Sequence, residues 1–508
     1  QAILGTVYQD LGLSDKAEAM HREVLTTATT FWGSEHTNVA SALSNLGATL
    51  QSQGKLAEAG TLDRQALAMR QRLLGNEHPD VAMALQNLAQ VLGLQGELVE
   101  AVAMLREVVA MQKKVLGPEH PDVATSIQNL GQTLRIQGNL DGCEAMEREA
   151  LALRRKILGD NHPDVAVSLN GLAIVFNEQG RLDEAEAMYR EALALRKTLL
   201  GNEHPEVAQT LNNLAITLQD QGKLKEAELA HREALATYRS VFGSEHPEVA
   251  NSLNNLSLVL RDAGGVAEAE AAEREALAIW RSLFCPEHPQ VATALNNLAV
   301  VFRDEARLAE AEATQNDALA MYRKLLGEEH PLVANALHNL GTILQMQGKS
   351  TEAEPRLQEA VAMRRKFLGN EHPRLATSLE CLAEVLRDNG ELDEAGILLR
   401  ECLTIRERRL PDDWPTSSAR SALGENLLQH KEYEEAERLL LSGFDGLKEL
   451  QARIPAGSKR YLTAAVERLI RLYEETDRPV KAAEWHRKLG ELTESVPEPE
   501  SGTARRQN

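Results

Sequence analysis

Aromatic residues are scarce in this chain of 508 residues: Phe, Trp and Tyr make up 4% of it, although hydrophobic residues make up 43%. Ala and Leu therefore supply most of the apolar surface, which favours helices packed closely through small side chains. Cysteine is rare as well, with four residues and no C-x-x-C pair. This usage argues against a disulfide framework and fits a reducing compartment, so we expect a cytoplasmic protein.

Basic residues are outnumbered, because 55 Lys and Arg stand against 76 Asp and Glu and leave a net charge of −21. Bulk binding to nucleic acid or to an anionic membrane needs a basic surface, so the composition argues against both. The chain also lacks an apolar run of about 18 residues, the length a spanning helix needs, and shows no signal peptide. We therefore expect no nucleic-acid partner and no membrane insertion.

What the chain does contain is a repeat with a period of 42 residues. His36-Thr37 and Trp414-Pro415 hold the same register at its two ends. A fixed period of this size is typical of a solenoid, which is one elongated array rather than several separate domains. The repeated dipeptide is His-Pro, beginning at His78, His120, His162, His204, His246, His288, His330 and His372.

Residues 205–243 show what one repeat encodes. Apolar residues recur there at spacings of three and four, which predicts two amphipathic helices, named helix A and helix B from here on. Pro205 suits the first turn of helix A. Gly222 and Gly243 end the two helices, and we expect Gly222 to supply a left-handed cap.

Small residues identify the kind of helical repeat. In helix A the marker residue Leu214 is followed by Ala215, and helix B carries Ala227 and Ala234 seven residues apart. This spacing resembles the tetratricopeptide repeat. The motifs Gly-x-x-His-Pro-x-Val-Ala and Leu-Asn-Asn-Leu-Ala in a 42-residue unit are similar to the repeat of kinesin light chain and its prokaryotic relatives. The resemblance implies an all-α, right-handed superhelical solenoid of about twelve helix-turn-helix repeats.

We expect three parts along the chain. Residues 1–410 hold the regular repeats, the first of them truncated, because Gln1 enters the register inside a helix A. Residues 411–490 hold two divergent capping repeats, since a terminal repeat must shield a face that has no neighbour. Residues 491–508 are expected to be disordered. The truncated start suggests that the chain was cut from a longer protein.

The C-terminal part carries a second resemblance. Residues 410–414 (Leu-Pro-Asp-Asp-Trp), 439–444 and 468–474 are similar to the ends of large bacterial serine/threonine protein kinases that carry repeats behind a catalytic domain. No kinase chemistry is encoded here, because the Gly-rich loop, the His-Arg-Asp loop and the Asp-Phe-Gly motif are absent. This resemblance implies a repeat region that belongs to a larger signalling protein.

Several residues depart from the repeat. Ala306 occupies the turn position held elsewhere by Gly, so we predict a locally altered turn there. Pro355 is expected in the first turn of a helix B, where it is tolerated. Cys143 and Cys402 replace Ala and are expected to be small buried residues, whereas Cys381 replaces Asn and Cys285 replaces Gly.

The repeated His residues do not indicate a metal site. Successive copies lie one repeat apart, on the order of 10 Å by helix-packing distances, which is too far to share an ion. We expect each His to pack at the entrance of helix A and to hydrogen-bond a neighbouring loop carbonyl. Phosphate-loop and nucleophile-elbow motifs are also absent. The sequence therefore predicts no catalytic residue, no metal and no cofactor.

The candidate binding residues lie on helix A, directly before the marker Leu. Asn is a mediocre helix former, yet it holds this position in seven repeats, and in a tetratricopeptide array the position faces the concave groove. Its amide donates and accepts, so a ladder of Asn could hold the main chain of an extended peptide; alternatively, each Asn only fixes helix stacking. The seven residues are Asn45, Asn87, Asn129, Asn213, Asn255, Asn297 and Asn339, and Gly171 and Cys381 are the exceptions.

One turn further along helix A, Arg recurs and could extend the same groove. Arg can grip a carboxylate bidentately, so a groove of mixed charge predicts a peptide of mixed or acidic character. The alternative is internal ion pairing with neighbouring acidic residues. The positions concerned are Arg135, Arg261, Arg303 and Arg387.

The sequence leaves three functions open. The first is a scaffold or adaptor, expected to be a monomer, that binds a protein or peptide ligand in the groove. The second is the non-catalytic sensor or docking region of a larger bacterial kinase. The third is an oligomerising array that uses its ends. The identity of a partner cannot be read from the repeat, because fold does not fix function.

Overall fold

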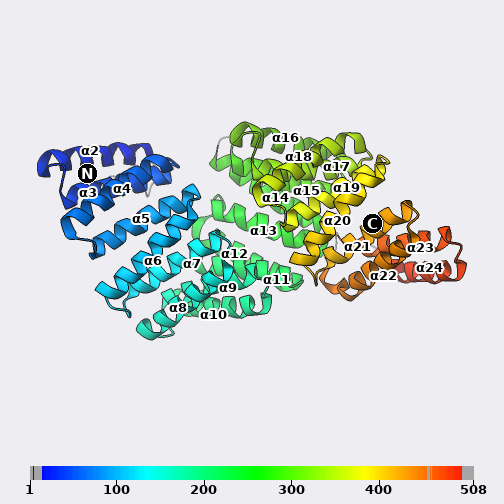
Figure 1. The fold of residues 1–508 in the computed structure, drawn as a ribbon, viewed down its shortest axis with the longest axis horizontal. Helices are drawn as coiled ribbons and strands as arrows, with labels where there is room; N and C mark the ends of the chain where they lie inside the picture. The colour runs from blue at the N-terminus through cyan, green and yellow to red at the C-terminus, as the bar shows by residue number, and fades with distance from the viewer. Residues whose placement is uncertain are drawn as a thin grey trace, which may run out of the picture. The chain divides into compact units, whose positions relative to one another are not determined.

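In the computed structural model, the residues that the structure describes are 4, 8, 14–284, 286–454, 458 and 460–494. Within them the regular structure is α-helical, apart from the short 3-10 helix η1 (Gln451–Arg453). The helices form two compact units, residues 1–217 and 218–508, and the boundary falls inside α11 (Pro205–Asp220). Each unit is described by itself (Figure 1).

Unit 1 is a stack of antiparallel helix pairs in which each helix from α2 to α10 packs against the next. Its described helices are α2 (Ser14–Trp32), α3 (Thr37–Ser52), α4 (Leu56–Leu74), α5 (Pro79–Gln95), α6 (Leu98–Val115), α7 (Pro121–Ile136), α8 (Leu140–Leu158), α9 (Pro163–Glu178), α10 (Leu182–Leu200) and the first part of α11. The truncated first helix A lies mostly outside the described residues.

Unit 2 continues the same alternation from the end of α11. Its helices are α12 (Leu224–Phe242), α13 (Pro247–Ala263), α14 (Val266–Leu283), α15 (Pro289–Asp304), α16 (Leu308–Leu326), α17 (Pro331–Met346), α18 (Ser350–Leu368), α19 (Pro373–Asp388), α20 (Leu392–Arg409), α21 (Trp414–Gln429), α22 (Tyr433–Glu449), α23 (Arg460–Glu475) and α24 (Pro479–Glu494). The expected all-α solenoid of helix pairs is confirmed. Residues 495–508 of the tail predicted to be disordered lie outside the described part.

Each repeated His is the N-cap of its helix A. In α17, for example, Nδ1 of His330 accepts a hydrogen bond of 3.1 Å from the backbone N–H of Leu332. The expected bond to a loop carbonyl is therefore wrong: the ring nitrogen accepts, so it carries no proton, and it satisfies an N–H that the first turn leaves unpaired. The same bond is made by His36, His78, His120, His162, His204, His246, His288 and His372.

The turn from helix A to helix B needs a positive φ. Gly222 has a φ of 77°, which confirms the predicted left-handed cap. Ala306 takes the same position with a φ of 58°, and the N–H of Arg307 still donates to the carbonyl of Phe302 over 2.9 Å. The predicted altered turn is therefore wrong, because Ala306 adopts the strained conformation instead. The last two pairs also have non-glycine residues with positive φ in this turn, Lys431 and Asp477.

Pro355 was expected in the first turn of helix B, and this is also wrong. Helix α18 begins at Ser350, so Pro355 is its sixth residue and lies in the second turn. There the ring removes the N–H that would otherwise donate to the carbonyl of Thr351, four residues earlier. The helix nevertheless continues to Leu368, so packing against its neighbours outweighs the lost bond.

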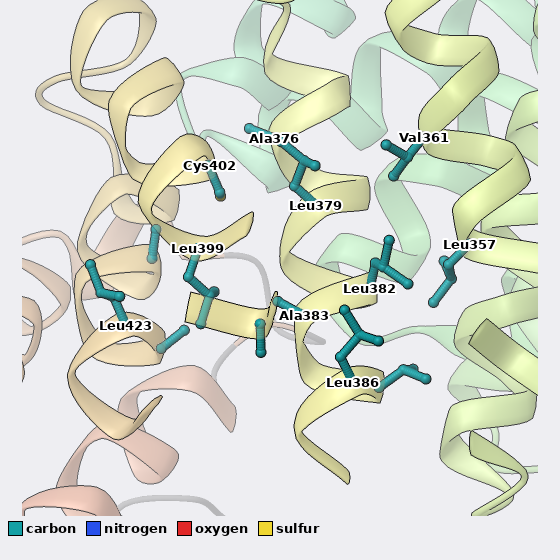
Figure 2. Close-up of a cluster of buried hydrophobic side chains, with 14 of the residues drawn as sticks. Leu357, Val361, Ala376, Leu379, Leu382, Ala383, Leu386, Leu399, Cys402 and Leu423 are labelled. Carbon is teal, nitrogen blue, oxygen red and sulfur yellow. The ribbon is translucent and has the colours of Figure 1, made fainter. Parts of the chain in front are cut away.

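The core of unit 2 consists of Leu and Ala side chains that interdigitate between consecutive helices (Figure 2). Leu379 and Leu382 of α19 lie between Leu357 of α18 and Leu399 of α20. Cys402 is fully buried in this cluster, and Cys143 is buried in unit 1, so both cysteines replace small core residues as expected. Cys285 lies outside the described residues.

Candidate peptide-binding face

The first helices of successive pairs lie side by side. In unit 2, α13, α15, α17, α19 and α21 contact one another in order. Their half-buried and exposed residues form a surface that we call the helix A face; α3, α5, α7 and α9 present the corresponding residues in unit 1. The predicted Asn positions lie on it: Asn45 is exposed, and Asn87, Asn129, Asn213, Asn255, Asn297 and Asn339 are half-buried.

Some of these Asn side chains join neighbouring helices. In unit 1, Nδ2 of Asn213 donates to Oδ1 of Asn170 over 3.3 Å. In unit 2, Nδ2 of Asn339 donates to Oδ1 of Asn296 over 3.0 Å. In both cases the partner lies 43 residues earlier, on the preceding helix A. An amide offers two N–H donors and an acceptor oxygen, so one such bond leaves the group able to make others.

The two exceptions in the Asn series, Gly171 and Cys381, lie in different surroundings. Gly171 faces a buried carboxyl, because a Cβ added there would lie 2.7 Å from Oε2 of Glu147. Cys381 is half-buried. Burial, together with the charges of Glu384 and Glu380, raises the pKa of the Cys381 thiol to about 12. It is therefore protonated at neutral pH and not a nucleophile.

The predicted Arg positions lie on the same face, and each is ion-paired within the chain. Asp304 binds two of them, with N···O distances of 2.7 Å to Arg261 and 2.8 Å to Arg303. The other pairs are Arg135 with Glu178 at 2.5 Å and Arg387 with Glu425 at 3.0 Å. Each of the four Arg side chains thus has an ion-pair partner within the chain, as the second interpretation of these positions requires.

Sequence reasoning missed a row of aliphatic side chains two residues after the marker Leu. Ile174 and Ile216 occupy it in unit 1, and Leu258 and Val300 occupy it in unit 2. Ile216 is 39% exposed and Leu258 is 40% exposed. Each lies three residues after a predicted Asn or its replacement, hence on the same side of its helix. An apolar residue on the otherwise polar side of helix A was the available signal.

The helix A face ends at α21. Nearly all residues of α21 from Thr416 to Leu428 are buried, and α23 packs against both α21 and α22. Burial would raise the pKa of Glu425 on α21, but the guanidinium groups of Arg468, Arg387 and Arg471 outweigh it and hold the pKa below its usual value. One carboxylate therefore links α19, α21 and α23.

The described residues hold no group of three His, Cys, Asp or Glu side chains that could bind a metal ion. Over the same part of the chain, no helix is long and apolar enough to span a membrane. The contacts of the face are those of amides, aliphatic groups and ion pairs, which suit reversible association with another polypeptide.

Comparison with solved structures gives kinesin light chain-like proteins. A Podosopora anserina kinesin light chain with nearly identical tetratricopeptide-like repeats is 28% identical, over 41% of this chain and 99% of that one, with a TM-score of 0.34. BtubC (BKLC) from P. vanneervenii is 25% identical, over 46% of this chain and 92% of that one, with a TM-score of 0.39. No curated protein matches the chain.

Comparison with family models covers most of the sequence. One tetratricopeptide repeat model matches residues 2–70, 38–114, 95–156, 127–198, 177–240, 206–282, 290–366 and 374–449, and a second matches residues 338–409. Proteins with such repeats generally serve as scaffolds for protein interaction. With its 42-residue helix pairs and the matches that span them, the chain belongs to the tetratricopeptide repeat family.

Proposed function

We propose that the protein is a non-catalytic scaffold that binds an extended segment of a partner protein on its helix A face. The observation that carries this proposal is the row of half-buried Asn side chains at one register position, beside exposed aliphatic groups such as Leu258. Amides that retain hydrogen-bonding capacity can hold the main chain of a ligand without requiring a particular sequence. The aliphatic groups offer contacts for its side chains.

The alternative to ligand binding is that the Asn residues only fix the helix stacking. The bond between Asn339 and Asn296 supports a stacking role for one donor of that amide. The two roles are compatible, because a half-buried amide has further donors and an acceptor. Replacing several Asn residues and measuring binding and folding separately distinguishes them.

The test is a variant of the full chain with Asn255→Ala, Asn297→Ala and Asn339→Ala together. We expect it to lose the proteins that the unchanged chain captures from an extract of its own host, identified by mass spectrometry, while its circular dichroism stays helical. Asn316→Ala is the matched control, because Asn316 is exposed on the helix B α16. Capture that survives the triple replacement would rule out the Asn ladder as the binding element.

A second proposal is that this scaffold is the docking region of a larger bacterial serine/threonine kinase and works in the cytoplasm. It is favoured by the C-terminal stretch that resembles such proteins. In that stretch Asp413 accepts a hydrogen bond from the N–H of Trp414 at the start of α21, and the Trp414 ring lies 5.6 Å from that of Tyr461. Sequencing the gene upstream of the codon for Gln1 tests it: a catalytic domain supports the proposal, and an unrelated reading frame contradicts it.

A further inference from the structure

The predicted Arg side chains of the helix A face in unit 2 are not free to bind a ligand. Its Arg side chains are already matched by carboxylates of the same chain: Arg261 and Arg303 bind Asp304, and Arg387 binds Glu425. These guanidinium groups would have to leave an existing partner before gripping an acidic ligand. These three guanidinium groups stand against five carboxyls at the same end of helix A, those of Asp220, Asp262, Asp304, Glu384 and Asp388, so the carboxyls outnumber them.

Four acidic residues of the same face make no ion pair with any described residue: Asp220, Asp262, Glu384 and Asp388. Burial and then the charges of Asp262 and Asp413 raise the pKa of Asp220. Burial, with a smaller contribution from Glu380, likewise raises the pKa of Glu384. The amides of Gln219 and Gln345 donate to Asp262 at 2.6 Å and to Glu384 at 3.3 Å, but an amide leaves the negative charge in place.

Aliphatic groups lie beside these acids. Leu258 is 40% exposed and Met346 is 38% exposed. Val300, which lies between them in the sequence, is half-buried. Leu258 and Asp262 are four residues apart on α13, so their side chains are neighbours on one side of the helix. The face thus combines apolar contact area with unmatched negative charge.

Helix α21, which follows α19 in the series of helices A, already contacts a helix that carries leucine and arginine. Helix α23 packs on α21, where its Leu469 and Leu472 are fully buried. Arg468 donates to the carboxylate of Glu425, and over 3.0 Å to Oγ of Ser421, both on α21. A segment of leucine and arginine thereby covers the next helix A after α19.

We propose that the helix A face from α13 to α19 binds a partner segment that combines aliphatic side chains with Lys or Arg. The aliphatic groups of the segment contact Leu258, Val300 and Met346. Its cations neutralise Asp262 and Glu384, together with the other two unpaired acids of the face. Complementary charge of this kind sets specificity and association rate. The inference rests on the proposed function, and it replaces the expectation of a mixed or acidic ligand with a basic one.

The test uses three fluorescein-labelled peptides of equal length that differ only at their apolar and charged positions: Leu with Lys, Leu with Glu, and Ser with Lys. Fluorescence anisotropy with the full chain should give the Leu–Lys peptide an affinity about tenfold or more above both others. Asp262→Asn with Glu384→Gln should weaken the Leu–Lys peptide several-fold. Asp317→Asn with Glu352→Gln, both on helices B and exposed, should not.

Stronger binding of the Leu–Glu peptide, equal binding of all three or no binding of any would overturn the inference, as would equal weakening by the two double variants. The triple Asn variant separates this failure from that of the proposed function. If it abolishes binding of a preferred Leu–Glu peptide, the face binds segments but the inferred chemistry is wrong. If it leaves every affinity and the captured proteins unchanged, the proposed function fails.

Discussion

The carboxyl of Glu147 on α8 lies where a Cβ on Gly171 of α9 would stand, so a side chain at position 171 requires this carboxyl to move. A Cβ on Gly171 would lie 2.7 Å from Oε2 and 2.9 Å from Cδ of Glu147. Glu147 is 1% exposed, and burial raises its pKa to about 7. In unit 1 this carboxyl occupies the space next to position 171, where most other repeats have Asn.

Gly171→Ala forces this buried carboxyl to shift, so it should destabilise the protein by about 1 kcal/mol, the low end of the range for overpacking in a core. Urea denaturation followed by circular dichroism measures the change. Gly93→Ala is the matched control: Gly93 is also inside a helix A, and a Cβ there would meet nothing within 4 Å. That replacement should stabilise the protein slightly. If adding Glu147→Ala does not reduce the cost of Gly171→Ala, the contact is not its cause.

Glu273 on α14 is a second buried carboxyl, at the helix B position of Glu147 three repeats on. It is fully buried, and among the described residues its oxygens have no hydrogen-bond partner apart from the nearby hydroxyl of Ser257. Burial raises its pKa from 4.5 to about 8, because the Ser257 hydroxyl and the charge of Arg261 offset only part of the desolvation. The folded chain thus keeps this proton at pH values at which the unfolded chain has lost it.

The resulting stability is fully present below about pH 4.5 and is lost as the pH rises towards 8. Glu273→Gln removes this dependence, so its advantage over the unchanged chain should grow from near zero at pH 4 to at most about 4 kcal/mol at pH 8. Denaturation midpoints at several pH values measure it. Gln315 holds the same position in the next repeat, which shows that the site accepts an amide. A difference that is constant with pH would contradict a buried, protonated Glu273.

The fold was predictable because every repeat carries the same local sequence signals. Pro205, Gly222 and the Ala positions of helix B define a helix pair, and nine copies remove the ambiguity that a single pair would leave. Such signals depend on residues a few positions apart. The structure confirms the helices and corrects only details, such as the position of Pro355 within α18.

The candidate site was less predictable, because many of its contacts join residues about 40 positions apart on different helices. Arg261 has a neighbouring acid in Asp262, yet it binds Asp304 on the next helix A. Glu425 attracts Arg387, Arg468 and Arg471 from two other helices. Only packing decides which guanidinium reaches which carboxylate, so the sequence could place the Arg residues on the face but could not show whether their charge was free.

Ala306 offers a test of turn strain. Its φ of 58° is costly for a residue with a Cβ, by about 1 kcal/mol. Ala306→Gly should therefore stabilise unit 2 by about 0.5–1 kcal/mol, measured as a shift of the thermal midpoint. Gly264→Ala, at the same turn position one repeat earlier with a φ of 88°, should lower the midpoint by a comparable amount. The thermal midpoint should therefore rise for Ala306→Gly and fall for Gly264→Ala. If it falls for both, the methyl group of Ala306 makes contacts that stabilise the protein by more than its strained φ costs.

The His caps predict which replacements helix A tolerates. Nδ1 of His330 satisfies the N–H of Leu332, so His330→Ala should cost about 1 kcal/mol, as the loss of other N-caps does. His330→Asn should cost much less, because the amide oxygen of Asn can accept the same bond; in α21 the N-cap is likewise a short polar residue, Asp413, which accepts from the N–H of Trp414. Hydrogen exchange at the amide of Leu332 and urea denaturation together measure the effect. If Asn proves as costly as Ala, the ring contributes through packing rather than through the cap, since only packing depends on the shape of imidazole.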